Sequence, residues 1–216
     1  MRILTILKIF ILVSVFGTFS SYAVAGSFLG TVTDQSGNPL EHAVITLVGD
    51  VAGLVNESVA MTPPVMAQHN IQFTPFVLPV AAGTLVSFPN KDKVRHHVYS
   101  FSNVKRFELE LYGEDEEKAV LFDEVGTVAL GCNIHDNMLA YIYIARSNSF
   151  SKSGEDGKVS IEKLEPGTYQ AYVWHPRLKG SDEDYQQSIV IGDQGTIEAN
   201  FEISLKRERN RRRSDY

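Results

Sequence analysis

The sequence predicts an all-β protein that consists of β-sandwiches. From residue 26 onward, short runs rich in Val, Ile, Thr, Phe and Tyr recur at short intervals, and clusters of Gly, Pro, Asn and Asp separate them. Such runs are typical of short strands joined by turns. Apolar residues at helical spacing do not form a convincing stripe in the central part of the chain. We therefore expect two packed layers of strands rather than helices.

The first 25 residues have the pattern of a secretory signal peptide. Met1-Arg2 precedes an apolar run from Ile3 to Val15, and Ala23-Val24-Ala25 follows shortly afterwards. The apolar run is short for a membrane span, and an Ala-x-Ala end is typical of a signal-peptidase site. We expect a mature chain of 191 residues that begins at Gly26, lies in the periplasm and has no membrane span.

Charge is distributed unevenly along the 216 residues, whose formal net charge is −6. Residues 26–205 hold 12 Lys or Arg against 24 Asp or Glu, whereas residues 206–216 hold six basic and two acidic residues. An acidic body argues against a nucleic-acid partner and favours a basic protein partner. The basic end is predicted to be a disordered tail.

The first strands are predicted between residues 27 and 48. Residues 34–39, Asp-Gln-Ser-Gly-Asn-Pro, supply turn residues between two β-branched runs, which indicates a hairpin. Residues 49–70 have weak periodicity and contain Thr62-Pro63-Pro64, which argues against a helix and against a central strand. We expect this segment to be a connection.

The middle of the chain is predicted to form a sandwich or barrel of eight short strands separated by turn residues. They are expected at Ile71–Phe73, Phe76–Val80, Thr84–Phe88, Val94–Phe101, Phe107–Leu111, Ala119–Phe122, Val128–Cys132 and Leu139–Ala145.

A third group of strands is expected after a Ser-rich link at residues 147–153. Residues 156–174 read as a strand, a turn at Pro166-Gly167 and another strand. Further strands are expected at Ser188–Ile191 and Thr196–Ser204.

The segment Gly131–Met138 contains the residues that point to a metal. Cys132, the only cysteine, stands three residues before His135 and six before Met138. A thiolate, an imidazole and a thioether together favour copper, whereas Met is not a usual zinc ligand. An unpaired thiol in an oxidising compartment also requires an occupant. We expect one copper ion, with a fourth ligand from another part of the chain.

Residues 65–146 resemble a cupredoxin of the plastocyanin and amicyanin kind. The motif is Phe88-x-Asn90, a histidine six residues beyond the Asn, and later Cys-x2-His-x2-Met, with the loop spacing of amicyanin. The resemblance implies a Greek-key β-sandwich with a type 1 (blue) copper site. The ligands that it implies are His96, Cys132, His135 and Met138.

Two histidines compete for the remote position. His96 matches the cupredoxin spacing, and because adjacent strand residues face opposite sides, only one of His96 and His97 can face the Cys132 loop. His97 stands where plastocyanin and amicyanin carry an Asn that ties the ligand loops together. We expect Asn90 and His97 to support the ligands, with His97 as a ligand or partner contact left as alternatives, and His69 to be a surface residue rather than a ligand.

The two ends of the chain resemble a carboxypeptidase regulatory-like β-sandwich. Residues 30–40 carry Gly-x-Val-x-Asp-x2-Gly-x-Pro-Leu, and residues 156–169 carry Asp-Gly followed by Leu-x-Pro-Gly-x-Tyr. The cupredoxin segment then interrupts this module, an arrangement similar to that of periplasmic proteins labelled as methylamine-utilisation proteins. The predicted organisation is a signal peptide at 1–25, a discontinuous sandwich at 26–60 and 147–205, a cupredoxin domain at 65–146 and a tail at 206–216.

The function that these features predict is electron transfer rather than enzymatic catalysis. The motifs contain no acid–base pair, nucleophile triad or phosphate loop. We expect a one-electron carrier that serves a redox partner such as a cytochrome or dehydrogenase. The acidic residues Glu114, Asp115, Glu116 and Glu117 form a candidate docking patch, with a solvated turn as the alternative. Other hypotheses are a copper carrier or buffer, and a module that binds carbohydrate or protein through the flanking sandwich.

Overall fold

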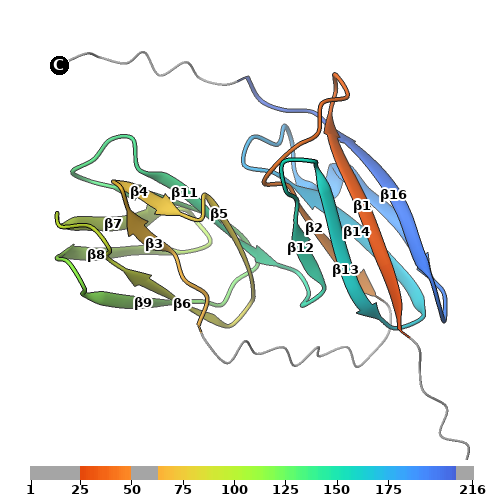
Figure 1. Cartoon of the computed structure of the whole chain (residues 1–216), viewed down its shortest axis with the longest axis horizontal. Coiled ribbons are helices and arrows are strands. Elements are labelled where there is room, and N and C mark those ends of the chain that lie inside the picture. The colour runs from red at the N-terminus through yellow and green to blue at the C-terminus, as the bar shows by residue number, and fades with distance from the viewer. Residues whose placement is uncertain (1–24, 50–62, 208–216) are drawn as a thin grey trace, which may run out of the picture.

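The computed structural model describes residues 25–49 and 63–207. The predicted signal peptide, apart from its last residue, and most of the predicted tail lie outside these residues. The described chain is all-β, as predicted, and its strands form two sandwiches that lie side by side (Figure 1). Within the described residues, no helix is long and apolar enough to cross a membrane.

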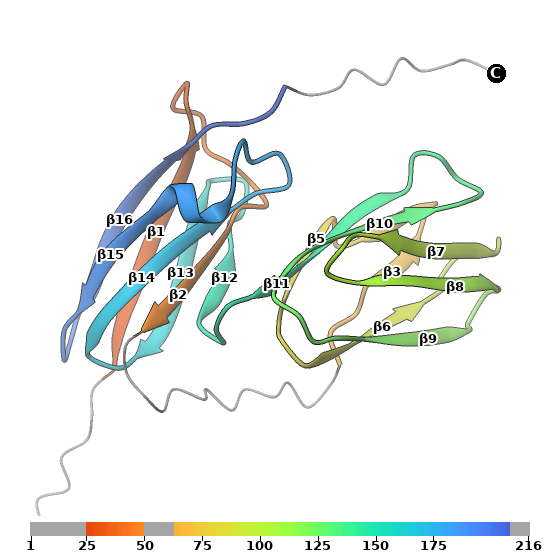
Figure 2. The ribbon, with the colours of Figure 1, turned by 180° about the vertical axis from the view of Figure 1, so that it is seen from behind.

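The first sandwich, which we call the flanking sandwich, is assembled from both ends of the described chain, as the sequence predicted. A three-stranded sheet in the order β13-β1-β16 faces a four-stranded sheet in the order β12-β2-β14-β15. The 3-10 turn η1 precedes β15 (Figure 2). The bounds are β1 (Gly26–Asp34), β2 (Val44–Gly49), β12 (Phe150–Lys152), β13 (Lys158–Leu164), β14 (Gly167–Trp174), η1 (Asp182–Tyr185), β15 (Gln186–Ile191) and β16 (Thr196–Ile203).

The second sandwich, which we call the central sandwich, is formed by the middle of the chain. It contains a five-stranded sheet in the order β5-β11-β10-β7-β8 and two antiparallel two-stranded sheets, β6-β9 and β3-β4. The bounds are β3 (Ala67–His69), β4 (Gln72–Thr74), β5 (Val77–Ala81), β6 (Thr84–Pro89), β7 (His96–Phe101), β8 (Arg106–Tyr112), β9 (Glu117–Phe122), β10 (Gly126–Cys132) and β11 (Leu139–Ala145).

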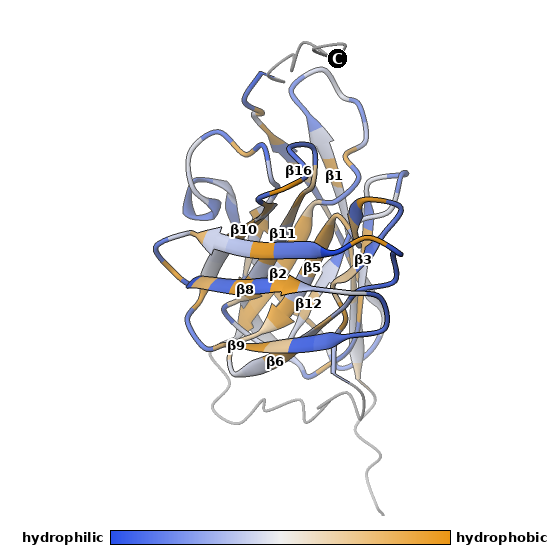
Figure 3. Cartoon of the chain, turned by 90° about the vertical axis from the view of Figure 1, so that its left-hand side faces the viewer, coloured by the Kyte–Doolittle hydropathy of each residue, from blue (hydrophilic) through white to orange (hydrophobic). Residues whose placement is uncertain are grey.

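Each sandwich has its own hydrophobic core because its strands alternate between inward and outward residues. In β1, Phe28 and Val32 are fully buried on the inward face. In the central sandwich, Phe88 and Val98 are fully buried in a separate cluster. Figure 3 shows that strands of the central sandwich carry both hydrophobic and hydrophilic residues. Alternation with a period of two is typical of strands that have one face in a core.

Strand β11 contributes to both cores. Ile142 and Ile144 are buried in the core of the central sandwich, whereas Tyr143 and Ala145, between and after them, are buried in the core of the flanking sandwich. The Tyr143 ring stacks on Trp174 of β14, with the ring centroids 4.8 Å apart. One strand therefore packs the two sandwiches against each other.

Two short strands lie where the sequence predicted connections. Strand β3 occupies the end of the 49–70 segment, and β12 occupies the Ser-rich link. Both are three residues long, and each pairs with only one other strand. Strands of this length are too short to show hydrophobic alternation, so pattern reasoning missed them.

Candidate metal centre

Three of the four predicted ligands come together at one end of the central sandwich. The ligand atoms of His96, Cys132 and His135 all lie within 4.8 Å of one another. Cys132 Sγ is 4.0 Å from His96 Nδ1 and 3.5 Å from His135 Nδ1. The two imidazole rings are tilted, with their centroids 4.9 Å apart. The ligand atoms of two imidazoles and one thiol thus lie close together.

The pairing of β7 with β10 creates this arrangement. Cys132 is the last residue of β10 and lies opposite Val98 of the antiparallel strand β7. Since side chains alternate along β7, His96 and Val98 both face the interior. His96 is fully buried and Cys132 is buried, whereas His135, in the turn after β10, is partly exposed. His135 is therefore the member of the cluster that solvent reaches most readily.

Met138 lies at the other end of the same turn. Its backbone N–H donates to His135 O at 3.0 Å, and β11 begins at the next residue. The Met138 side chain is 3% exposed and belongs to the same hydrophobic cluster as Cys132. Both residues also line a shallow surface pocket beside Tyr99 and Phe101. The thioether is thus buried near the thiol.

Asn90 shapes the turn that leads into His96. Its fully buried side chain donates from Nδ2 to Val94 O at 2.8 Å and to Tyr112 O at 3.1 Å. Its Oδ1 accepts from the Asp92 N–H at 2.9 Å. Because these bonds fix the backbone between Asn90 and His96, they define where β7 begins.

Asp92 is a partner of the histidine cluster that sequence reasoning missed. Its Oδ2 accepts a hydrogen bond from His96 Nε2 at 2.8 Å. Burial raises the pKa of the Asp92 carboxyl, but hydrogen bonds from the Ile71 N–H, His96 and the Asn70 N–H outweigh it, so the pKa lies below its ordinary value. An Asp four residues before a His is a weak signal in sequence, because its role depends on how the intervening turn folds.

The His97 side chain lies on the opposite face of β7 from Cys132. Its Nε2 is 2.7 Å from Glu108 Oε1, and its buried Nδ1 has no hydrogen-bond partner among the described residues. The His97 carbonyl accepts the Asn133 N–H at 3.3 Å. His97 thus links to the Cys132 turn through its backbone rather than its imidazole.

The four acidic residues of the predicted docking patch lie at the turn between β8 and β9. All four are exposed. Glu116 Oε1 accepts the Gly113 N–H at 3.1 Å, and Glu117 accepts a hydrogen bond from Ser87. The Asn90 N–H donates to Glu116 O at 3.0 Å, which brings this turn next to the turn that precedes His96.

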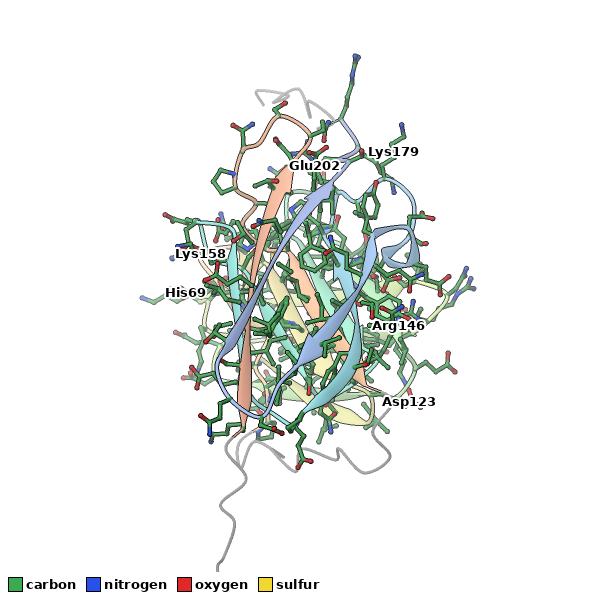
Figure 4. The ribbon with its side chains drawn as sticks, turned by 90° about the vertical axis from the view of Figure 1, so that its right-hand side faces the viewer. His69, Asp123, Arg146, Lys158, Lys179 and Glu202 are labelled. Carbon is green, nitrogen blue, oxygen red and sulfur yellow. The ribbon has the colours of Figure 1, made fainter. Side chains whose placement is uncertain are left out.

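The remaining histidines lie outside the cluster. His69 is an exposed residue at the end of β3 (Figure 4). His175 is buried and follows β14 in the flanking sandwich, where its Nδ1 accepts the Arg177 N–H at 3.1 Å.

One family model and several solved structures match part of this chain. The family model described as polysaccharide lyase family 4, domain II, matches residues 118–199, which include strands of both sandwiches. No curated protein matches the sequence.

Three solved structures that match each cover about two-fifths to a half of this chain. A Cu-containing nitrite reductase from Thermus scotoductus SA-01 is 24% identical over 39% of this chain and 23% of that chain, with a TM-score of 0.38. A purple cupredoxin from Nitrosopumilus maritimus is 21% identical over 38% of this chain and 96% of that chain, with a TM-score of 0.34. A variant of amicyanin in its Cu(I) state is 19% identical over 46% of this chain and 97% of that chain, with a TM-score of 0.36. The chain thus spans less than a quarter of the nitrite reductase.

Proposed function

We propose that this protein is a periplasmic type 1 copper protein that carries single electrons between redox partners. The observation that supports the proposal most directly is the convergence of His96, Cys132 and His135, whose ligand atoms lie within 4.8 Å of one another. Met138, buried beside Cys132, is the proposed weak axial ligand. Two imidazoles, one thiolate and a thioether are the ligands of blue-copper electron-transfer sites.

The distances are compatible with a bound metal ion. With metal–sulfur and metal–nitrogen bonds of about 2.3 Å and 2.0 Å, a sulfur and a nitrogen ligand atom in trigonal or tetrahedral geometry lie about 3.5–3.7 Å apart. Cys132 Sγ lies 3.5 Å from His135 Nδ1 and 4.0 Å from His96 Nδ1. Small side-chain adjustments would therefore be enough to accommodate a metal ion.

The residues around the cluster have separate roles in this proposal. Bound copper would supply one-electron exchange between Cu(I) and Cu(II). His96 and Cys132 are buried and hold their ligand atoms away from water, which suits a site that must keep its geometry in both states. His135 is partly exposed, and its neighbour Ile134 is 49% exposed, so a partner would approach the ligands over this turn.

We propose two domains with the boundaries that the sequence predicts, namely a cupredoxin domain at 65–146 and a flanking sandwich from 26–60 and 147–205. The periplasmic location rests on the signal-peptide pattern of the first 25 residues, nearly all of which lie outside the described part of the chain.

Absorption and electron-spin spectra of the copper-loaded protein test the metal site. We expect an intense visible charge-transfer band in the oxidised protein, because a thiolate–copper bond produces it. Cys132→Ser and His135→Gln should each abolish or strongly weaken the band. His69→Gln, which changes an exposed histidine outside the cluster, is the matched control and should leave the band unchanged.

Other outcomes of the same experiment separate the alternatives. A colourless protein that binds one copper ion would identify a copper carrier or buffer. A protein that takes up no copper would leave only an interaction module, and the electron-transfer proposal would be abandoned.

We further propose that the acidic turn between β8 and β9 binds a basic redox partner. Glu114 and Asp115 are exposed, and the turn adjoins the segment that leads to His96. Opposite charges at the rim of an interface mainly raise the association rate, and salt screens this effect.

Stopped-flow electron transfer to a small basic cytochrome tests this docking surface. The double variant Glu114→Gln/Asp115→Asn avoids Glu116 and Glu117, whose side chains make local hydrogen bonds. It should lower the bimolecular rate constant at low salt and flatten its dependence on ionic strength. Glu198→Gln/Glu202→Gln on β16 removes the same charge from the other sandwich and should have a smaller effect. Equal effects of the two double variants would refute the assignment.

A further inference from the structure

His96, the buried histidine of the cluster, has a neighbour at each of its two ring nitrogens. Its Nδ1 faces Cys132 Sγ, while its Nε2 donates to Asp92 Oδ2 at 2.8 Å. The His96 side chain is fully buried and that of Asp92 is 11% exposed. A carboxylate only accepts hydrogen bonds, so the imidazole proton lies on Nε2 and the Nδ1 lone pair is free to face the metal position.

Asp92 is itself fixed by the hairpin between β3 and β4. Its Oδ1 accepts the Asn70 N–H at 2.7 Å, and its Oδ2 accepts the Ile71 N–H at 3.0 Å. Asn70 and Ile71 have φ values of 54° and 56°, in the left-handed region that a β-branched residue such as Ile rarely adopts. Backbone of this kind persists where the surrounding structure holds it in place, and such positions cluster at functional sites.

The same strand provides an internal comparison. The residue after His96 in β7 is His97, whose Nε2 is 2.7 Å from Glu108 Oε1. The chain therefore contains a second carboxylate–histidine pair. The Glu108 side chain is 66% exposed, and the pair lies on the outward face. Solvent therefore screens the Glu108 charge far more than that of Asp92.

We propose that Asp92 is a positioning residue for the metal site, which holds the His96 ring and lowers the reduction potential of the bound copper. This inference rests on the proposed copper site. A hydrogen bond from a ligand histidine to a carboxylate fixes the orientation of the ring and raises its basicity as a ligand. A nearby negative charge in surroundings of low polarity favours the more positive oxidation state, Cu(II), over Cu(I).

The decisive experiment is the reduction potential of the copper-loaded Asp92→Asn protein. Asn has nearly the same size and keeps one oxygen, which can accept from the Ile71 N–H and His96 Nε2, but it lacks the charge and the second oxygen that accepts the Asn70 N–H. Loss of such a supporting group typically lowers metal affinity 10–100-fold. If the variant loses tenfold in affinity for Cu(II) relative to Cu(I), its potential rises by about 59 mV.

Glu108→Gln is the matched control, because it removes the same charge from the histidine on the other face of β7. It should leave the potential close to that of the parent protein. A parent-like potential in Asp92→Asn, with the blue band intact, would overturn the inference while leaving the copper site standing. A parent protein without a blue band would instead overturn the proposed function.

A second measurement covers the case in which Asp92→Asn does not fold. Nitrogen-15 NMR of the histidines in the unmodified Cu(I)-loaded protein reports which His96 nitrogen carries the proton. We expect a slowly exchanging proton on Nε2, hydrogen-bonded to Asp92, and no proton on Nδ1. Rapid exchange of the Nε2 proton with solvent would contradict the proposed role of Asp92, whereas a proton on Nδ1 would contradict His96 as a copper ligand and so the proposed function.

Discussion

At the scale of single residues, the environment of each histidine decides its chemistry. His96 is buried between a thiol and a carboxylate, whereas His97 points to the other face of the strand towards Glu108. His175 is buried in the flanking sandwich, away from both. Spacing along the chain favoured His96 over His97, but the partners of each ring, a thiol, a carboxylate or a backbone N–H, are visible only in the packing around it.

His175 should make the stability of the protein depend on pH. Burial, together with the positive charge of Arg177, lowers the pKa of His175 from 6.5 to about 4. Between these values the unfolded chain binds a proton that the folded chain does not, so stability falls as the pH falls from 6.5 to 4. His175 lines a surface pocket beside Trp174 and Asp182, so solvent reduces the effect. We expect the free energy of unfolding to fall by about 1–2 kcal/mol through this group.

Urea unfolding between pH 4 and pH 7 measures this effect. His175→Gln removes the titrating group, so its free energy of unfolding should change less over this range than that of the parent. His69→Gln removes an exposed histidine and should reproduce the pH dependence of the parent. A His175→Gln protein with the parent's pH dependence would show that the ring is not kept neutral by burial.

At the scale of elements, short turns with specific backbone geometry determine how the strands meet. The turn before β13 ends at Gly157, whose φ is +71° and whose N–H donates to Gly154 O at 3.0 Å. The Gly157 carbonyl accepts the Val32 N–H at 2.9 Å and so joins β13 to β1. This turn holds together segments that are more than a hundred residues apart in sequence.

Gly157→Ala should destabilise the protein by about 2–3 kcal/mol. A Cβ at this position would lie 2.6 Å from Val32 O, a backbone atom, and the residue has a left-handed conformation that Ala disfavours. Gly154→Ala is the control, because its nearest neighbour would be an ordinary 3.5 Å away, and it should cost less than about 0.5 kcal/mol. Similar free energies of unfolding for the two variants would contradict this account.

At the scale of the whole molecule, the two sandwiches are coupled through β11. Its alternate residues are buried in different cores, and Tyr143 stacks on Trp174. The Tyr143 hydroxyl also donates to Asp182 at 2.9 Å, and Arg146 pairs with the same carboxylate. Loss of either core therefore exposes apolar residues of β11.

We expect the two sandwiches to unfold in one cooperative transition. Fluorescence of Trp174, the only tryptophan, and far-ultraviolet circular dichroism should give the same denaturation midpoint. Val32→Ala, a fully buried change in the flanking core, should lower both midpoints together. Val190→Ala, at a position that is 65% exposed, should shift neither. Two separate transitions in the parent protein would instead indicate independent sandwiches.

The all-β class, the approximate position of most strands and the origin of the flanking sandwich from both chain ends could be predicted from the sequence. These features depend on local patterns, namely runs of β-branched and aromatic residues and the turn residues between them. The Cys132–Met138 spacing belongs to the same category, since a short turn keeps its members close. Strands β3 and β12 were not predicted, because a strand of three residues is too short to show a recognisable sequence pattern.

The contacts between segments that are distant in sequence are visible only in the folded chain. The register of β7 on β10 brings His96, and not the His97 side chain, to Cys132. The β3–β4 hairpin fixes Asp92 behind His96, and β11 divides its side chains between two cores. Such contacts depend on how strands pair and pack. A one-residue change in the register of a strand would turn its inward-facing side chains to the opposite face of the sheet.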